Sequence, residues 1–153
     1  MKELLREVKS KVFNGVDVKL TDVVVEAESK EYNACRFSLK GKRIISRTSK
    51  ITPKKKGQFV TFYQRNNNGV IEPLHEQDHL DYFLVTIQNN KGFFLLPKQV
   101  LIEKGILSTL EKEGKRAFRV YMPSDELTSK QALATQKWQS DYFYDVKKEI
   151  VEK

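Results

Sequence analysis

The sequence lacks several features that would assign it to a particular class of protein. It has one cysteine in 153 residues, Cys35, which excludes an internal disulfide or a cysteine-based zinc site and fits a reducing compartment. No apolar run approaches the roughly eighteen residues that would span a bilayer. The N-terminal segment MKELLREVKSKVF carries Glu3 and Glu7 where a signal peptide would be apolar. We therefore expect a cytoplasmic protein that does not enter a membrane.

Length and composition are those of an ordinary folded protein. Hydrophobic residues make up 39% and charged residues 31%, which is typical of neither a disordered nor a fibrous chain. A chain of 153 residues can bury one core and is short for two. We predict a single domain over residues 1–153; the sequence gives no indication of the oligomeric state.

Acidic residues are missing from one long stretch. Residues 32–71 contain ten of the 28 Lys and Arg residues and no Asp or Glu, so the rest of the chain holds 18 basic and 20 acidic residues. The whole excess of the +8 net charge therefore lies in this stretch. Crowded like charges repel, whereas a polyanion at the surface would compensate them through counterion release. A well-solvated face that aids solubility is the alternative.

The first half of the chain predicts two helices and a hairpin. Apolar residues at helical spacing indicate a helix over residues 4–12, and a possible N-cap, Thr21, favours a second over residues 21–31, although three consecutive valines leave a strand open. From residue 33 the period becomes two, and Gly41 turns the chain into a strand over residues 42–51. Arg43 and Arg47 should share a face of that strand.

The second half alternates strands and helices. Loop 52–57, TPKKKG, must expose its lysines because adjacent ammonium groups cannot be buried. Strands are expected at 58–65, 81–87, 93–96 and 116–122, of which 81–87 is apolar enough to be central, and a helix should begin at Pro97 and end at Gly105. A last helix is expected over 129–151. Its apolar stripe comprises Leu133, Ala134, Trp138, Tyr142, Val146 and Ile150. This order predicts an α/β domain, a mixed β-sheet flanked by helices.

Five segments together resemble the MepB family of small bacterial proteins, one member of which is encoded beside a multidrug efflux pump. The segments are EYNACRFSLKGKRIISRTSKITPKKKGQFVTFYQR, DHLDYFLVTI, GFFLLPKQVL, GKRAFRVYMPS and ATQKWQSDYF. The resemblance runs from about Glu31 to Phe143, and SKITPKKKGQFV is its most specific part. It implies a restriction-endonuclease-like core and, by analogy at the level of the fold, a nucleic-acid partner.

Active nucleases of that fold place an Asp at the head of one strand and Glu-x-Lys on the next, so that two carboxylates hold Mg²⁺. Here Asp81 heads the apolar strand and Lys98 keeps the lysine, but Leu96 replaces the second carboxylate. The available substitutes are Glu31, Glu72 and Asp78. We therefore expect Asp81 and Lys98 to be remnants of a catalytic site, and we expect no resident metal or cofactor. The alternative is a Mg²⁺-dependent nuclease, which would bind Mg²⁺. Asp81 as a turn residue and Lys98 as a surface charge would be the structural interpretation.

The segment His75 to His79, HEQDH, fits the H-E-x-x-H pattern, which on a helix presents two imidazoles to zinc. Pro73 lies two residues ahead, Asp78 puts a charge inside the motif, and a strand is expected from Asp81, which leaves less than two helical turns. We predict no zinc site.

The remaining interpretation is binding of DNA or RNA with weak sequence preference, because Arg and Lys neutralise phosphates and hydroxyl or amide groups donate to them. Tyr63 would stack on a base if it faces outward, and Thr135, Gln136 and Gln139 beside Trp138 form a second polar cluster that reaches bases or solvates the last helix. A regulatory module for an acidic protein partner is a further alternative. The predicted nucleic-acid-binding residues are Arg36, Arg43, Arg47, Lys50, Thr52, Lys54, Lys55, Lys56, Gln58 and Arg65.

Overall fold

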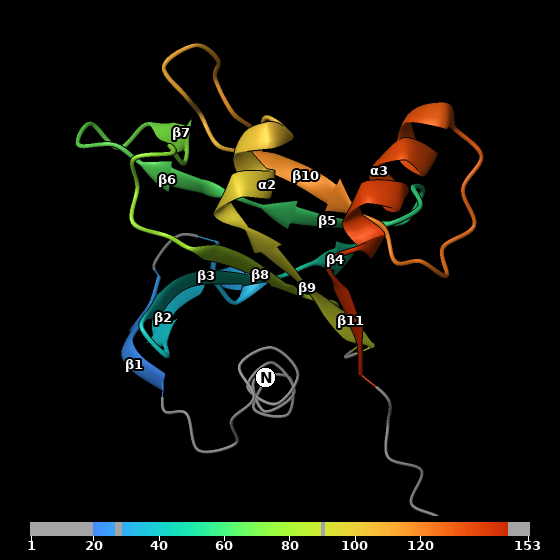
Figure 1. Ribbon diagram of the computed structural model, residues 1–153, viewed down its shortest axis with the longest axis horizontal. Helices are drawn as coiled ribbons and strands as arrows, with labels where there is room; N and C mark the ends of the chain where they lie inside the picture. Colours follow the sequence, from blue (N-terminus) through green and yellow to red (C-terminus); the bar gives the residue numbers. More distant parts are fainter. Residues whose placement is uncertain (1–19, 27–28, 90, 147–153) are drawn as a thin grey trace, which may run out of the picture.

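The computed structural model describes residues 20–26, 29–89 and 91–146 (Figure 1). The helix predicted over residues 4–12 lies outside them. The strands are β1 (Leu20–Val25), β2 (Cys35–Leu39), β3 (Lys42–Thr48), β4 (Lys50–Ile51), β5 (Gln58–Thr61), β6 (Tyr63–Arg65), β7 (Ile71–Pro73), β8 (Tyr82–Thr86), β9 (Gly92–Pro97), β10 (Ala117–Val120) and β11 (Phe143–Asp145). The helices are the 3₁₀ turn η1 (Lys30–Tyr32), α2 (Lys98–Glu103) and α3 (Lys130–Ser140).

The largest sheet has six strands in the order β1-β2-β3-β8-β9-β11. β3 and β8 pair in parallel and the other neighbours pair antiparallel, so the predicted α/β class with a mixed sheet is confirmed. β8 lies between β3 and β9, as its apolar sequence predicts. Its side chains alternate between two cores: Phe83 and Val85 belong to one cluster, and Leu84 belongs to another on the opposite face.

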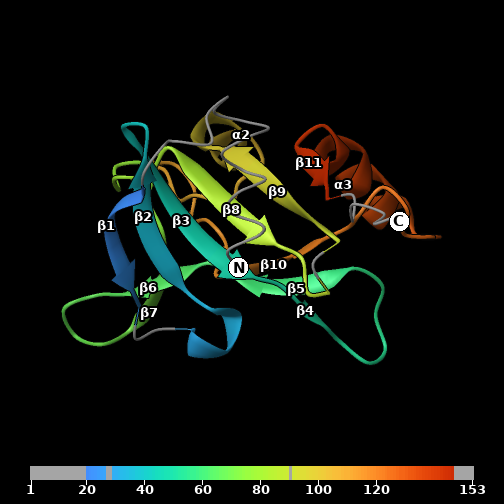
Figure 2. The same ribbon diagram turned by 90° about the horizontal axis from the view of Figure 1, so that it is seen from below.

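A second, three-stranded sheet, β10-β5-β4, covers one face of the large sheet (Figures 1 and 2). Phe62, which follows β5, stacks on Phe83 of β8 with ring centroids 4.1 Å apart. Leu101 of α2 and Val120 of β10 belong to the same buried cluster. Burial of these apolar side chains therefore holds both sheets and α2 together around one core.

Two predicted strands are divided between sheets. Residues 42–51 form β3 in the large sheet and β4 in the small one, and residues 58–65 form β5 and then β6, which pairs with β7.

Pro97 precedes the helix in an extended conformation, with ψ of 151°, so α2 begins one residue later than predicted. The chain turns around Gly69, whose backbone amide donates to the Asn66 carbonyl over 2.9 Å.

The helix favoured over residues 21–31 is wrong, and the strand left open there is correct. Residues Leu20–Val25 form β1, which pairs antiparallel with β2 at the edge of the sheet, followed by η1. β-branched valines lose side-chain entropy in a helix and suit a pleated strand, and the free edge of β2 supplies the backbone partners.

The long last helix is also wrong. α3 ends at Ser140, and the chain then forms β11, which pairs with β9 and sets Phe143 on Phe94 with centroids 5.0 Å apart. Pairing satisfies the edge of β9, a gain that helical periodicity does not reveal. The predicted stripe is a core only in part. Leu133 is 44% exposed and Ala134 is exposed, whereas Trp138, Tyr142 and Val146 are partly buried against the core clusters. Ile150 lies outside the described residues.

In the part of the chain that the structure describes, no helix has the length and apolar character to cross a membrane.

Candidate nucleic-acid interface

The loop of residues 52–57, here called the lysine loop, joins β4 to β5. It projects from the body of the protein (Figure 2), and Lys54, Lys55 and Lys56 are all exposed, as the sequence predicts. Pro53 begins its turn and Gly57 ends it at a φ of +76°. The protein thus presents three ammonium groups on one short projection.

Arg119 of β10 anchors the lysine loop. Its Nη1 donates to the Lys56 carbonyl over 3.1 Å and to the Gly57 carbonyl over 3.4 Å, and its Nη2 donates to the Thr52 hydroxyl over 2.5 Å. The guanidinium also lies 5.9 Å from the ring centroid of Phe59. All these partners are neutral, so Arg119 orders the loop and keeps its own positive charge. Sequence reasoning missed Arg119, because it lies outside the acid-free stretch and only pairing of β10 with β5 brings it there.

Gly57 allows the lysine loop to approach β10 closely. A Cβ at this position would lie 2.5 Å from Cδ1 of Tyr121 and 2.8 Å from the Val120 carbonyl oxygen. Both distances are shorter than van der Waals contact, and one of them involves backbone. Any larger residue would therefore push the loop away from the strand that anchors it.

Arg47, predicted to contact phosphate, is buried with 1% exposure, which corrects that prediction. Its Nη1 donates to Glu26 Oε1 over 3.5 Å and to the Ser46 carbonyl over 3.0 Å. Burial lowers the pKa of the Arg47 guanidinium, and the charge of Glu26 acts in the opposite direction. β3 is an inner strand whose two faces are both covered, so sharing a face with exposed Arg43 does not make Arg47 accessible.

Gln58 is corrected in the same way. It is 6% exposed, and its Oε1 accepts from the Ser49 hydroxyl over 2.6 Å and from the Gln88 amide over 3.1 Å. Gln58 therefore joins the lysine loop to the large sheet and is not a phosphate donor.

Arg36 and Arg43 are exposed but belong to another part of the surface. They line a hollow of about 470 Å³ over β1 to β3, together with Asp22. Arg36 Nε donates to Glu26 Oε1 over 3.3 Å. Carboxylates therefore accompany the positive charge here, unlike at the lysine loop.

Lys50 and Arg65 are separated from each other. The Lys50 ammonium lies 5.0 Å from the ring centroid of Tyr32, and Arg65 Nη1 donates to the Gly69 carbonyl over 2.8 Å in the β6–β7 hairpin. An extended chain rises roughly 3.3 Å per residue, which puts Arg65 about 23 Å along the chain from Gln58 at the end of the lysine loop. The ten predicted residues thus form no single surface. Thr52, Lys54, Lys55 and Lys56 come together with Arg119.

Asp81 and Lys98 are neighbours whose side chains point to different partners. The Lys98 amide donates to the Asp81 carbonyl over 2.9 Å. Asp81 Oδ2 accepts the Arg43 amide over 2.8 Å, and Lys98 Nζ donates to the Asp78 carbonyl over 3.2 Å. Among the described residues no group of three or more His, Cys, Asp or Glu is arranged to hold a metal ion.

The HEQDH segment forms a turn rather than a helix. His75 Nδ1 accepts the Gln77 amide over 3.1 Å, and Asp78 Oδ2 accepts the His75 amide over 2.7 Å. The two imidazoles therefore do not share a helix face.

The polar cluster on α3 ties that helix to β10. Gln139 is fully buried, accepts the Tyr121 amide over 2.8 Å and donates to the Arg119 carbonyl over 2.9 Å. Gln136 Nε2 donates to the carbonyls of Met122 and Asp125, both over 2.9 Å. The amides of Gln136 and Gln139 are therefore held by the backbone. Thr135 and Gln139 line a cleft between β10 and α3, and Gln136 does not. Tyr63 is half-buried.

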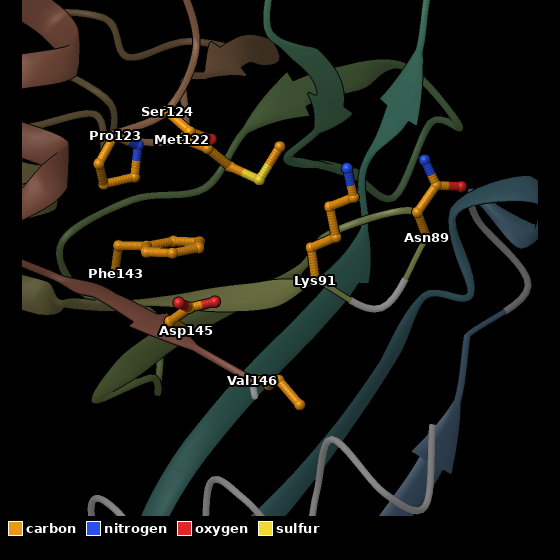
Figure 3. A pocket seen from close by; sticks show the side chains of 8 residues that line it. All are labelled: Asn89, Lys91, Met122, Pro123, Ser124, Phe143, Asp145 and Val146. Atoms are coloured by element: carbon orange, nitrogen blue, oxygen red, sulfur yellow. The ribbon is translucent and has the colours of Figure 1, made fainter. Parts of the chain in front are cut away.

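A hollow of about 550 Å³ near β11 has a different character (Figure 3). Met122, Pro123 and Phe143 form its apolar wall, and its charged residues, Lys91 and Asp145, have opposite signs. This balance does not suit a polyanion.

Comparison with known proteins assigns the family. The family model described as MepB-like matches residues 26–145. The crystal structure of MepB has 36% sequence identity and a TM-score of 0.83, over 97% of each chain. A bacterial homing endonuclease, I-Ssp6803I, has 11% identity and a TM-score of 0.48 over 90% of this chain and 86% of that one, a likeness too small to support a conclusion. No curated protein matches the sequence. With the family model and the MepB structure both matching most of its length, the chain belongs to the MepB-like family.

Proposed function

We propose that the protein binds nucleic acid through the lysine loop, with Lys54, Lys55 and Lys56 contacting backbone phosphates. The observation that carries this proposal is a set of three exposed lysines on a loop to which the Arg119 guanidinium donates hydrogen bonds through uncharged acceptors. Ion pairs among the described residues include Arg36–Glu26, Arg47–Glu26 and Arg116–Glu113, and no ion pair between described residues involves the loop. The charge of the loop is therefore available to an anion.

The chemistry of the loop favours binding with weak sequence preference. A lysine ammonium is a compact point charge, so it contacts any phosphate and reads no base edge. The long, exposed side chains of a projecting loop suit the backbone of a polyanion better than a small ligand, which needs a concave site.

The proposal is binding without efficient cleavage. Two-metal hydrolysis needs carboxylates free to hold Mg²⁺, but Asp81 accepts a backbone amide and Lys98 donates to a carbonyl. A single carboxylate, one oxygen of which already accepts an amide, supports this non-cleaving proposal. Asp81 acts in this arrangement as a link between β8 and the start of β3.

Fluorescence anisotropy across a salt series tests the proposal. The protein is titrated into labelled single-stranded and duplex DNA and RNA, beside a Lys54→Ala/Lys55→Ala/Lys56→Ala variant. Each neutralised phosphate contributes about 0.9 to the slope of log K against log salt for duplex DNA and about 0.7 for single strands. Removal of three lysine contacts should therefore lower the slope by about 2.7 on duplex DNA and about 2.1 on single strands. The matched control removes three exposed lysines elsewhere, Lys30, Lys42 and Lys137, and should change the slope less.

Two results would reject the proposal. Absence of binding by the wild type at low salt would leave the charge to an acidic protein partner or to solubility. An equal loss of slope in the two triple variants would show that net charge, and not the lysine loop, governs binding. Cleavage of the labelled strand in Mg²⁺ that Asp81→Asn abolishes would reject the non-cleaving part alone.

A further inference from the structure

A cleft lies beside the lysine loop, between β10, α3 and the end of α2. Its volume is about 370 Å³, and Figure 1 shows β10 running between the two helices. Sites for small molecules span about 300–1,000 Å³, so the cleft has room for a group of nucleotide size and none for a duplex.

The charged residues that line the cleft are all cations: Lys104, Lys115 and Arg119. None of the three belongs to the ion pairs found in the described residues. Lys104 Nζ lies 5.4 Å from the ring centroid of Trp138, an attraction that orients the ammonium without neutralising it. The cleft therefore concentrates positive charge that its own walls do not compensate.

The other walls of the cleft are aromatic and polar. Trp138 and Tyr121 are half-buried there, and Gln131 and Thr135 add an amide and a hydroxyl. Cations beside an aromatic ring are the combination that sites for single-stranded nucleic acid use, because phosphates take the charge and a base takes the ring.

Arg119 connects the cleft to the lysine loop. It lines the cleft, and with Thr52, Pro53, Lys54 and Lys55 it also lines a second hollow of about 340 Å³ on the loop side. One phosphate chain can thus pass from the loop lysines over Arg119 to Lys104 and Lys115 without meeting a carboxylate among the residues that line these two hollows.

We propose that this cleft takes one unpaired nucleotide of a single-stranded nucleic acid whose neighbouring phosphates lie on the lysine loop. A phosphate of that nucleotide binds Lys104 and Lys115, and its base lies against Trp138. The inference rests on the proposed function and adds to it a preference for single strands, because a base held in a duplex cannot enter a cleft between a strand and a helix.

Intrinsic fluorescence tests the cleft directly, since Trp138 is the only tryptophan of the chain. The full chain is titrated with oligothymidylate, a duplex of the same length and thymidine monophosphate, and Trp138 emission and anisotropy of a labelled strand are recorded together. We expect quenching by the single strand and none by the duplex. A Lys104→Ala/Lys115→Ala variant should bind the single strand about tenfold more weakly and lose the quenching. The matched control, Lys112→Ala/Lys137→Ala, removes two exposed lysines that do not line the cleft and should keep both.

The outcomes separate the two proposals. Binding of the single strand without quenching, or an equal loss in the two double variants, overturns the cleft and leaves the lysine loop standing. Quenching by thymidine monophosphate that oligothymidylate does not displace shows a free-nucleotide site and also overturns it. No binding of any nucleic acid in the anisotropy channel rejects the proposed function and the cleft with it.

Discussion

Arg47 and the lysine loop belong to the same acid-free stretch, yet they end in opposite environments. Arg47 is 1% exposed and lies beside Glu26, whereas Lys54, Lys55 and Lys56 are exposed and pair with no acidic side chain of the described residues. The difference shows that a run of basic residues predicts an exposed basic surface only where the backbone forces the side chains into solvent. A projecting loop forces such exposure, whereas an inner strand of a sheet that is covered on both faces does not.

The two regions use their charge differently. At Arg47, burial is offset by a carboxylate at 3.5 Å and a carbonyl at 3.0 Å, and the pair lies where β1, β2 and β3 meet. At the lysine loop, Arg119 orders the backbone, while the three lysines have no ion-pair partner in the part of the chain that the structure describes. We therefore expect substitutions near Arg47 to change stability and substitutions in the loop to change binding.

The largest effect should follow from removing the partner of Arg47. Glu26→Gln leaves the buried guanidinium without a compensating charge, and we expect the free energy of unfolding to fall by about 3 kcal/mol. Urea denaturation followed by circular dichroism measures it. Glu113→Gln is the matched control, because Glu113 accepts from Arg116 over 3.3 Å but both side chains are exposed, so the expected loss is below about 0.5 kcal/mol. Equal losses in the two variants would contradict the contrast between a buried and an exposed charge.

A smaller effect is expected at the junction of the lysine loop and β10. Gly57→Ala adds a Cβ in collision with Tyr121 and strains a positive φ, and we expect a loss of about 2 kcal/mol together with weaker nucleic-acid binding. Gly69→Ala has nearly the same φ, +77°, with nothing within 4 Å of the new Cβ, so it isolates the strain and should cost about 1 kcal/mol without changing binding. If Gly57→Ala binds like the wild type, close packing on β10 does not organise the loop.

The smallest effect concerns Cys35 of β2, which pairs with Ser46 of β3, the strand that also carries Arg47. Burial raises the pKa of the Cys35 thiol. A thiol whose pKa is higher in the folded state stabilises the fold fully below its unfolded pKa of about 8.5 and loses that contribution as pH rises further. We expect the stability of Cys35→Ala to fall less steeply than that of the wild type above about pH 8.5. Burial also raises the pKa of Tyr32, but that residue is present in both proteins and cancels in the difference. Parallel stability curves would contradict the prediction.

The sequence was sufficient to predict those parts of the fold that depend on residues close together along the chain. Adjacent lysines between Pro53 and Gly57 had to form an exposed loop, alternation around Phe37 had to give a half-buried strand, and the apolar run 82–86 had to lie inside the sheet. Each of these depends on residues within a few positions of one another. The family could also be identified from the sequence, because its most specific segment, SKITPKKKGQFV, is a continuous run of residues.

Only the tertiary structure decided which backbone edges and charges would meet. β1 and β11 form because the edges of β2 and β9 offer hydrogen-bond partners, which outweigh the helical patterns of residues 21–31 and 141–146. Arg47 is buried with Glu26, the residue that follows β1, as its partner. Arg119 joins the lysine loop because β10 pairs with β5 from more than fifty residues away. The sequence determined how much positive charge the protein carries and which loop must expose it. Long-range pairing decided which cations stay at the surface, since a strand's neighbours cannot be read from its own residues.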